Sequence, residues 1–284
     1  MQWLGRRESS NVDDRRGFSG GGIAAGGGII GVIIYLVYSF LSGNNIDPSQ
    51  IPSVANGGNT TLSPEEQQAD DKRASFVKVV LADTEDIWGE LFKKNGKQYT
   101  DPTLVLYRNQ VASACGGASA ASGPFYCPGD GKLYVDLSFY EDMQTKLNAP
   151  GDFAMAYVIA HEVGHHIQNL EGTADKIGRM RQQAGEAESN RLSVMMELQA
   201  DFYAGVWAHY EQQKKNIIEQ GDIEEALNAA NAIGDDRLQK RSTGEVVPDA
   251  FTHGTSQQRM YWFKKGFDTG DMSQGNTFAE LSKN

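Results

Sequence analysis

The sequence predicts an α+β protein that is mostly helical with a small sheet and is preceded by one transmembrane helix. Helical periodicity dominates from Asp152 onward, whereas strand-like runs are few, the clearest being TLVLY at 103–107 and KLYVDL at 132–137. Residues 21–41 contain no charged side chain. The part of the chain that follows is long enough to bury one sizeable core and falls within the size range of a single domain.

The N-terminal region carries the signals of a membrane anchor. Residues 21–41 are about long enough to cross a bilayer as a helix, which takes about 20 apolar residues. Four arginines precede this run, so the positive-inside rule makes residues 1–20 a cytoplasmic tail and places the later chain outside. A cleaved signal peptide is the alternative, but the run exceeds a usual signal core and no clear A-x-A site follows. Residues 42–62 are interpreted as a linker and residues 63–284 as the domain.

The predicted helices of the domain have recognisable boundaries. Ser63, Pro64 and Glu66 fit the N-cap, N1 and N3 positions of a capping box that opens a long amphipathic helix. Later helical patterns cover residues 152–170, 186–214, 222–234 and 256–268.

Charge and cysteine content limit the partners and the environment of the domain. A formal net charge of -11, without a basic stripe, disfavours nucleic-acid binding. Cys115 and Cys127 are the only cysteines, and outside the cytoplasm a disulfide between them is expected. The alternatives are two unpaired thiols in a cytosolic domain or two sulfur ligands of a structural metal. A single cysteine pair makes a structural zinc site the weaker of these.

A metal-binding pattern lies on the helix predicted over residues 152–170. The motif HEVGHH places His161 and His165 one turn apart on one face, with Glu162 rotated by about 100 degrees. Two imidazoles in this arrangement can bind zinc beside a carboxylate that acts on water. The helix is apolar enough to be buried, and buried polar groups need partners, which favours the metal interpretation. A chance HExxH remains the alternative, because the five-residue pattern is common.

A second apolar helix carries two acids as E-L-Q-A-D. Glu197 and Asp201 are four residues apart and therefore share one face. Glu197 can supply the third zinc ligand, and Asp201 can accept the remaining ring N–H of either histidine. Alternatively, the two acids pair with arginines such as Arg191 or Arg259, or Asp201 rather than Glu197 is the ligand.

These residues resemble a known family. The HEVGHH and ELQAD helices, the stretch GPFYCPGDGKLYVDL and the terminal THGTSQQRMYWFKKGF are similar to the neutral zinc metallopeptidases of bacteria, over roughly residues 63–270. In gluzincins generally, HExxH followed by ExxxD provides two His ligands, one Glu ligand and an orienting Asp. The resemblance implies a zincin-like domain that binds one Zn²⁺ per chain and hydrolyses peptide bonds with Glu162 as general base.

Further roles follow from the expected mechanism. A donor outside the metal shell usually stabilises the oxyanion, and His253 is the first candidate, with Tyr261 second. His253 can equally cap the adjoining helix. His166 and His209 are interpreted as packing or surface residues. Zincin domains bind substrate along the edge strand above the metal helix, and residues 132–137 are expected to form that edge.

Two hypotheses from different classes account for these patterns. The first is a membrane-anchored metalloendopeptidase that faces the bacterial periplasm or cell wall and cleaves a peptide or protein. The second is a zinc-binding but proteolytically inactive, membrane-tethered interaction module. Glu162 favours the enzyme, because structural zinc sites are normally closed by four protein ligands and need no base.

Overall fold

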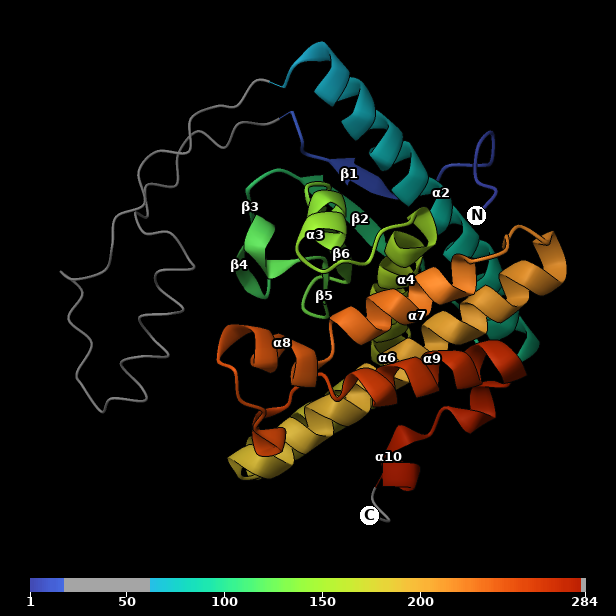
Figure 1. Cartoon of the computed structure of the whole chain (residues 1–284). Coiled ribbons are helices and arrows are strands. Elements are labelled where there is room, and N and C mark those ends of the chain that lie inside the picture. The colour runs from blue at the N-terminus through green and yellow to red at the C-terminus, as the bar shows by residue number, and fades with distance from the viewer. Residues whose placement is uncertain (18–61, 282–284) are drawn as a thin grey trace.

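The computed structural model describes residues 1–17 and 62–281 (Figure 1). The helices are α2 (Pro64–Lys94), α3 (Phe139–Thr145), α4 (Asp152–Leu170), α5 (Thr173–Gln183), α6 (Glu186–Lys215), α7 (Asp222–Ala232), α8 (Asp235–Ser242), α9 (Ser256–Thr269) and α10 (Thr277–Leu281). The strands are β1 (Val12–Asp14), β2 (Thr103–Tyr107), β3 (Gln110–Ser113), β4 (Gly116–Ser119), β5 (Phe125–Cys127) and β6 (Lys132–Asp136). Short 3-10 turns are η2 (Ala120–Ser122), η3 (Pro248–Ala250) and η4 (Met272–Gln274). These elements agree with an α+β domain that is mostly helical.

The long helix α2 begins with the capping box that the sequence predicts. The Ser63 hydroxyl accepts the Glu66 N–H at 3.2 Å, and the Glu66 carboxylate accepts the Ser63 N–H at 2.8 Å. These contacts satisfy donors that have no partner inside the helix. Trp88 and other apolar residues of α2 enter the main core, and this burial supplies most of the stability of such a helix.

Four strands form a mixed sheet in the order β1-β2-β6-β5. The first three are parallel to one another, and β5 is antiparallel to β6. Because side chains alternate along a strand, Leu104 and Leu133 face the helical core, whereas Val105 and Tyr134 face a smaller cluster on the other side. The prediction that residues 132–137 form the edge strand is wrong. β6 lies between β2 and β5, so β5 is the edge strand and it contacts α4.

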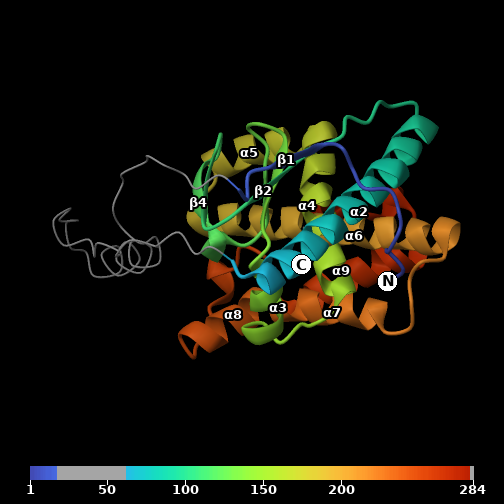
Figure 2. The same ribbon diagram turned by 90° about the horizontal axis from the view of Figure 1, so that it is seen from above.

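The N-terminal segment, residues 1–17, belongs to the same folded body as the helices. β1 pairs in parallel with β2, with Val12 opposite Leu104. Arg16 Nη1 lies 2.5 Å from the Asp70 carboxylate of α2. Figure 2 shows this segment in blue beside β2 and α2.

The predicted single-pass membrane topology is therefore wrong. It places residues 1–20 and the domain on opposite sides of a membrane, whereas β1 and β2 are neighbours in one sheet. None of the helices within residues 1–17 and 62–281 combines the length and the apolar character that a membrane span needs. The candidate span at 21–41 lies outside the described residues, as does nearly all of the predicted linker at 42–62. The arginines interpreted as a cytoplasmic signal instead pair with acidic side chains, as Arg16 does with Asp70.

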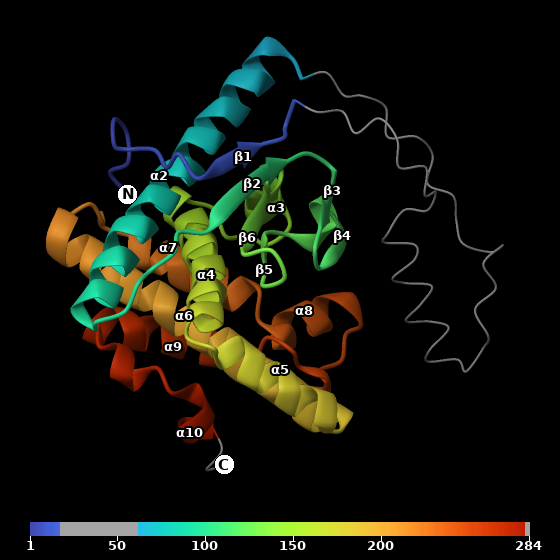
Figure 3. The same cartoon turned by 180° about the vertical axis from the view of Figure 1, so that it is seen from behind.

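α4 lies at the centre of the fold, between the sheet and α6 (Figure 3). It is buried along most of its length, as its apolar composition predicts. Beyond it, α6 crosses α9 at very short range because two glycines face the crossing. A Cβ on Gly205 would lie 2.0 Å from the Phe263 carbonyl oxygen, and one on Gly266 would lie 2.1 Å from the Phe202 carbonyl oxygen. This crossing brings the first turns of α9 next to the middle of α6.

The helical patterns predicted at 152–170, 186–214 and 256–268 correspond to α4, α6 and α9, whose ends differ by at most one residue. The pattern predicted over 222–234 is shorter, because α7 ends at Ala232 and α8 begins at Asp235. At Gly234, between them, a Cβ would lie 2.4 Å from Ser256 N, so the chain passes directly against the start of α9. Neither α5 nor α8 was predicted, since both are polar surface helices.

Candidate active site

α4 places two imidazoles side by side. His161 and His165 make a T-shaped contact with ring centroids 4.8 Å apart, as expected for residues one turn apart. Gly164 precedes His165, and a Cβ at this position would lie 2.9 Å from the Cα and carbonyl oxygen of Ala200 in α6. Glycine at 164 therefore allows α6 to approach the histidine face of α4.

α6 brings a carboxylate to both imidazoles. Glu197 Oε2 lies 3.2 Å from His161 Nε2, and Glu197 Oε1 lies 3.4 Å from His165 Nε2. One ligand atom from each of the three side chains lies within 4.8 Å of the other two. The structure thus brings together the three residues predicted as metal ligands.

The two imidazoles and the Glu197 carboxylate require positive charge between them. An Nε2 atom without a hydrogen presents a lone pair and cannot donate a hydrogen bond to Glu197. Burial lowers the pKa of His161, but Asp201 and Glu197 outweigh burial and raise that pKa to about 9. Burial raises the pKa of Glu197, but His165 and His161 outweigh it and hold that pKa well below its ordinary value. Protons on both rings or one metal ion would meet this requirement, and two imidazoles with one carboxylate are a donor set that zinc accepts.

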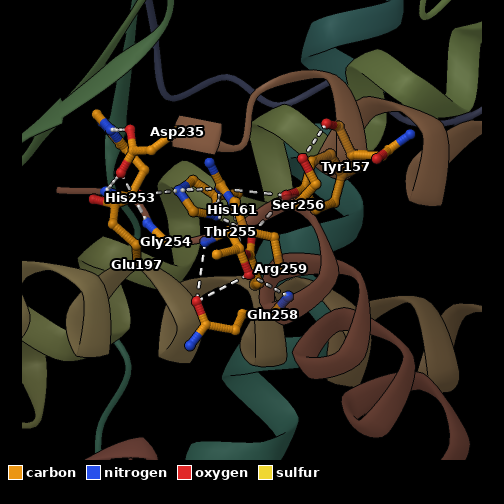
Figure 4. A network of polar contacts seen from close by, with 12 residues as sticks. Tyr157, His161, Glu197, Asp235, His253, Gly254, Thr255, Ser256, Gln258 and Arg259 are labelled. Carbon is orange, nitrogen blue, oxygen red and sulfur yellow. Dashed lines mark hydrogen bonds and ion pairs between the residues drawn. The ribbon is translucent and has the colours of Figure 1, made fainter. Parts of the chain in front are cut away.

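The buried carboxylate of Asp201 supports His161 at the ring nitrogen that does not face Glu197. His161 Nδ1 lies 2.8 Å from Asp201 Oδ1 and donates to it, which leaves Nε2 facing Glu197. Asp201 also accepts from the Tyr157 hydroxyl at 2.5 Å and from Arg259 Nε at 2.8 Å. Figure 4 shows Tyr157, His161 and Arg259 converging in one network. Burial raises the pKa of Asp201, but Arg259 and His161 outweigh burial and lower it to about 2.

The arginine pairing considered as an alternative for the two acids is present for one of them. Arg259 binds Asp201, but it does so together with the histidine contact and not in place of it. Arg191 instead binds Glu188 on the surface of α6. Glu197 keeps both carboxylate oxygens directed at the two imidazoles.

The side-chain amide of Gln168 supports His165. His165 Nδ1 lies 2.9 Å from Gln168 Oε1. The Gln168 amide nitrogen in turn donates to the Met196 carbonyl at 2.7 Å and to Gln199 Oε1 at 3.1 Å. Gln168 is absent from the predicted site, although its spacing of three residues from His165 puts both side chains on one face. The two histidines therefore have chemically different supports.

Glu162 lies between the edge strand and the cluster formed by His161, His165 and Glu197. It is buried, and burial raises the pKa of its carboxyl group, while His161 and His165 lower it. The backbone N–H of Tyr126, in β5, also lowers the pKa of this carboxyl group, so β5 lies near Glu162. A carboxyl group with a raised pKa in this position is suited to proton transfer.

His253 is held in its loop by an aspartate that the sequence patterns did not identify. Asp235 Oδ1 lies 3.1 Å from His253 Nδ1, and Asp235 Oδ2 accepts the backbone N–H groups of Thr252, His253 and Gly254. The bond to Asp235 raises the pKa of His253; burial opposes this rise, and the charge of Glu197 adds to it. Figure 4 shows Asp235, His253 and Glu197 on the same side of the network. The N-terminal position of Asp235 on α8 could not be predicted because α8 itself was not.

Comparison with known proteins assigns the chain to a family. A family model described as "putative neutral zinc metallopeptidase" matches residues 1–278. This chain belongs to that family. The "Uncharacterized protein YpfJ" of Escherichia coli K12 is 53% identical over 297 residues, which covers 99% of each chain. The "Uncharacterized protein Mb2605" of Mycobacterium bovis is 44% identical over 191 residues, or 64% of each chain. No solved structure matches this chain.

In this zinc metallopeptidase family member, the two cysteines are bonded as predicted. Cys115 and Cys127 form a disulfide with their Cα atoms 5.8 Å apart. Cys127 is the last residue of β5, so the bond ties the edge strand to the turn between β3 and β4. The cysteine loop therefore adjoins the element that runs beside Glu162.

The remaining candidate residues lie apart from the His161 and His165 imidazoles. Tyr261 follows Arg259 by two residues on α9, so it lies on roughly the opposite face, and it is 51% exposed. His209 Nδ1 donates to the Phe267 carbonyl at 2.7 Å, which agrees with the first of the two roles predicted for it, packing or surface. His166 is buried and faces β5.

Proposed function

We propose that this chain hydrolyses peptide bonds with one zinc ion bound by His161, His165 and Glu197. The observation that carries the proposal is the convergence of these side chains, whose ligand atoms lie within 4.8 Å of one another. Each imidazole is also supported through Nδ1. Three protein ligands leave a coordination position open, which is typical of catalytic zinc sites and unlike closed structural ones.

Glu162 is the proposed general base. Zinc, when bound, lowers the pKa of water in its open position to around 7 and polarises a substrate carbonyl. Glu162 would take a proton from the attacking water and deliver it to the leaving amine. Burial supports this role because it raises the pKa of the carboxyl group and so brings it closer to a neutral working pH.

His253 is the proposed donor to the oxyanion that forms when water attacks the carbonyl. Its Nδ1 faces Asp235, so Nε2 is the nitrogen available to substrate. Both ring nitrogens carry hydrogens only in the protonated ring, and the raised pKa of His253 favours that form. Asp235 would act as a positioning residue, because it also fixes the backbone of the His253 loop.

An extended peptide is the substrate that the neighbouring edge strand favours. Within the residues that the structure describes, β5 pairs with β6 on one side only, and the backbone of Tyr126 is close enough to Glu162 to lower the pKa of its carboxyl group. A peptide that adds to this open edge would bring its backbone next to the proposed base. Recognition through main-chain groups favours cleavage within a chain over removal of a terminal residue.

A zinc-binding but proteolytically inactive interaction module is the competing proposal. It accounts for the ligands equally well, but it gives no function to the buried Glu162 or to the Asp235–His253 pair. Substitution of Glu162 separates the two proposals, because the base is not a ligand.

The experiment compares the full chain with Glu162→Gln, His161→Ala and Glu197→Ala, and uses His209→Ala as a remote histidine control. We expect about one zinc per chain in the wild type, the control and Glu162→Gln, and loss of zinc in the two ligand variants. Cleavage of a mixed peptide library should stop with chelator and fall by at least about 100-fold in Glu162→Gln. Zinc binding without cleavage would favour the interaction module, and absence of zinc from the wild type would contradict both proposals.

A further inference from the structure

The third histidine of HEVGHH makes no contact with the metal-ligand cluster, yet it is almost fully buried. His166 is 4% exposed and both ring nitrogens have partners. Nε2 lies 2.7 Å from the Thr100 carbonyl oxygen, and Nδ1 lies 3.0 Å from the Tyr126 hydroxyl. His166 therefore links α4 to the edge strand β5 and to the chain that enters β2.

The direction of each hydrogen bond in this group follows from the atoms involved. A carbonyl oxygen only accepts, so His166 Nε2 carries the hydrogen. Nδ1 of the neutral ring then accepts from the Tyr126 hydroxyl, and the same hydroxyl oxygen accepts from Asn169 Nδ2 at 3.0 Å. The three side chains therefore form a satisfied chain of donors and acceptors that ends on the Thr100 carbonyl.

Tyr126 is the centre of a strand that pairing alone fixes weakly. β5 is three residues long and, in residues 1–17 and 62–281, has one strand neighbour, β6. Strands this short with one free edge open readily unless side chains hold them. On the outer face, Cys127 is bonded to Cys115 and Phe125 stacks on Tyr134 with centroids 4.8 Å apart.

On the inner face, the side chain of Tyr126 joins β5 to α4. Its hydroxyl binds His166 and Asn169, and its ring contacts the His166 ring with centroids 5.3 Å apart. The distance between β5 and the HExxH residues of α4 therefore depends on the contacts among Tyr126, His166 and Asn169.

We propose that His166 is a positioning residue which, with Tyr126 and Asn169, fixes the edge strand β5 over α4 and thereby sets how tightly an extended peptide is held beside Glu162. The part that concerns the peptide rests on the proposed function. The part that concerns the strand does not, because it follows from the contacts of β5 alone.

The test uses the full chain with Tyr126→Phe and His166→Phe. Tyr126→Phe removes one hydroxyl and keeps the ring and the backbone, so it carries the test if His166→Phe fails to fold. His209→Phe is the matched control, because it also removes an imidazole-to-carbonyl bond, the one between His209 and Phe267. The readouts are zinc content, kcat and KM on a cleaved peptide, and amide hydrogen exchange across β5.

We expect Tyr126→Phe and His166→Phe each to bind zinc as the wild type does, to raise KM by about tenfold and to change kcat by less than about twofold, because each removes two hydrogen bonds from the group that holds β5. Amides of β5 should exchange about tenfold faster, while those of β2 keep their rates. His209→Phe should leave KM and β5 exchange unchanged.

Wild-type exchange of β5 in Tyr126→Phe would overturn the proposal, as would an unchanged KM or equal effects in His209→Phe. A wild-type protein that binds zinc but cleaves no peptide would instead contradict the proposed function. Faster exchange confined to β5 in the two variants would still support the positioning role in that case.

Discussion

Arg259 and Asp201 form a fully buried two-point contact: Arg259 Nε lies 2.8 Å from Asp201 Oδ2, and Nη2 lies 2.9 Å from Oδ1. One guanidinium thus neutralises the carboxylate that supports His161. Removing one partner of a buried ion pair leaves the other charge uncompensated, which is far costlier than losing a surface pair. The contact therefore links the stability of the α6–α9 crossing to the support of a proposed ligand.

Arg259→Gln should weaken zinc binding and destabilise the fold. We expect roughly 10- to 100-fold lower zinc affinity, as for other substitutions behind a metal-ligating histidine, and a loss of about 3–5 kcal/mol in the free energy of unfolding. Competition with a zinc chelator and thermal unfolding measure the two effects. Arg191→Gln is the matched control, since Arg191 pairs with Glu188 on the surface and its loss should cost no more than about 1 kcal/mol. Equal effects in the two variants would contradict the role of Arg259.

Gly164→Ala should push α4 and α6 apart. The new Cβ would lie 2.9 Å from backbone atoms of Ala200, which cannot move aside as a flexible side chain can. We expect a loss of about 1–3 kcal/mol from overpacking, together with weaker zinc binding. Gly178→Ala, in α5, is the control because a Cβ there meets nothing within 4 Å. Gly178→Ala should stabilise α5 by up to about 1 kcal/mol. If Gly164→Ala also stabilised the protein, the site would not need the close approach of α4 and α6.

Asp235→Asn should lower the pKa of His253, because the bond to Asp235 is the main cause of its rise. Protonated His253 stabilises the folded chain, and this contribution is complete below the unfolded pKa of about 6.5 and is lost as pH rises through the raised folded pKa. In the variant, the pH at which activity falls on the alkaline side should move to lower values, while zinc content stays unchanged. NMR titration of His253 checks the assignment, and an identical titration in both proteins would contradict it.

Deletion of residues 1–17 should prevent normal folding, because it removes β1 and the arginine contacts to α2. A finer test is Arg16→Ala, which takes one guanidinium from the buried Asp70, although Arg108 still binds that carboxylate. We expect a loss of about 1–3 kcal/mol, measured by denaturant unfolding. The control Arg15→Ala breaks a pair with the exposed Asp13 and should cost no more than about 1 kcal/mol. Similar losses in the free energy of unfolding would show that the buried Arg16–Asp70 contact stabilises the fold no more than the exposed Arg15–Asp13 pair does.

Much of the candidate site could be predicted from local sequence patterns. α4 and α6 have strong helical periodicity, and spacing along a helix determines which side chains share a face, so His161 and His165 could be paired before the fold was known. That Glu197 reaches both imidazoles depends on the packing of α4 against α6, which Gly164 permits. The resemblance to a family supplied that step, and spacing alone left Asp201 as an alternative ligand.

The parts that the sequence did not reveal depend on contacts between distant segments. β1 and β5 are three residues long, too short for a periodic pattern, and β1 is rich in charge. The basic N-terminal segment therefore resembles a membrane-topology signal in the sequence, although Arg16 is neutralised by acids of α2 in the fold. Asp235 reaches His253 from 18 residues away through a helix start that no pattern marked. Each of these contacts forms only when the chain has folded.

The brevity of β5 also bears on how copies of this protein behave toward one another. A sheet with two exposed edges can recruit further chains and grow into aggregates, and proteins limit this with short or charged edge strands. Here one edge is β1, which carries Asp13 and Asp14, and the other is a three-residue strand bounded by a disulfide. An edge strand of that length can pair through its main chain with a single extended segment, but it is too short to fix the register of a second sheet. The same strand can therefore admit a peptide and still discourage polymerisation.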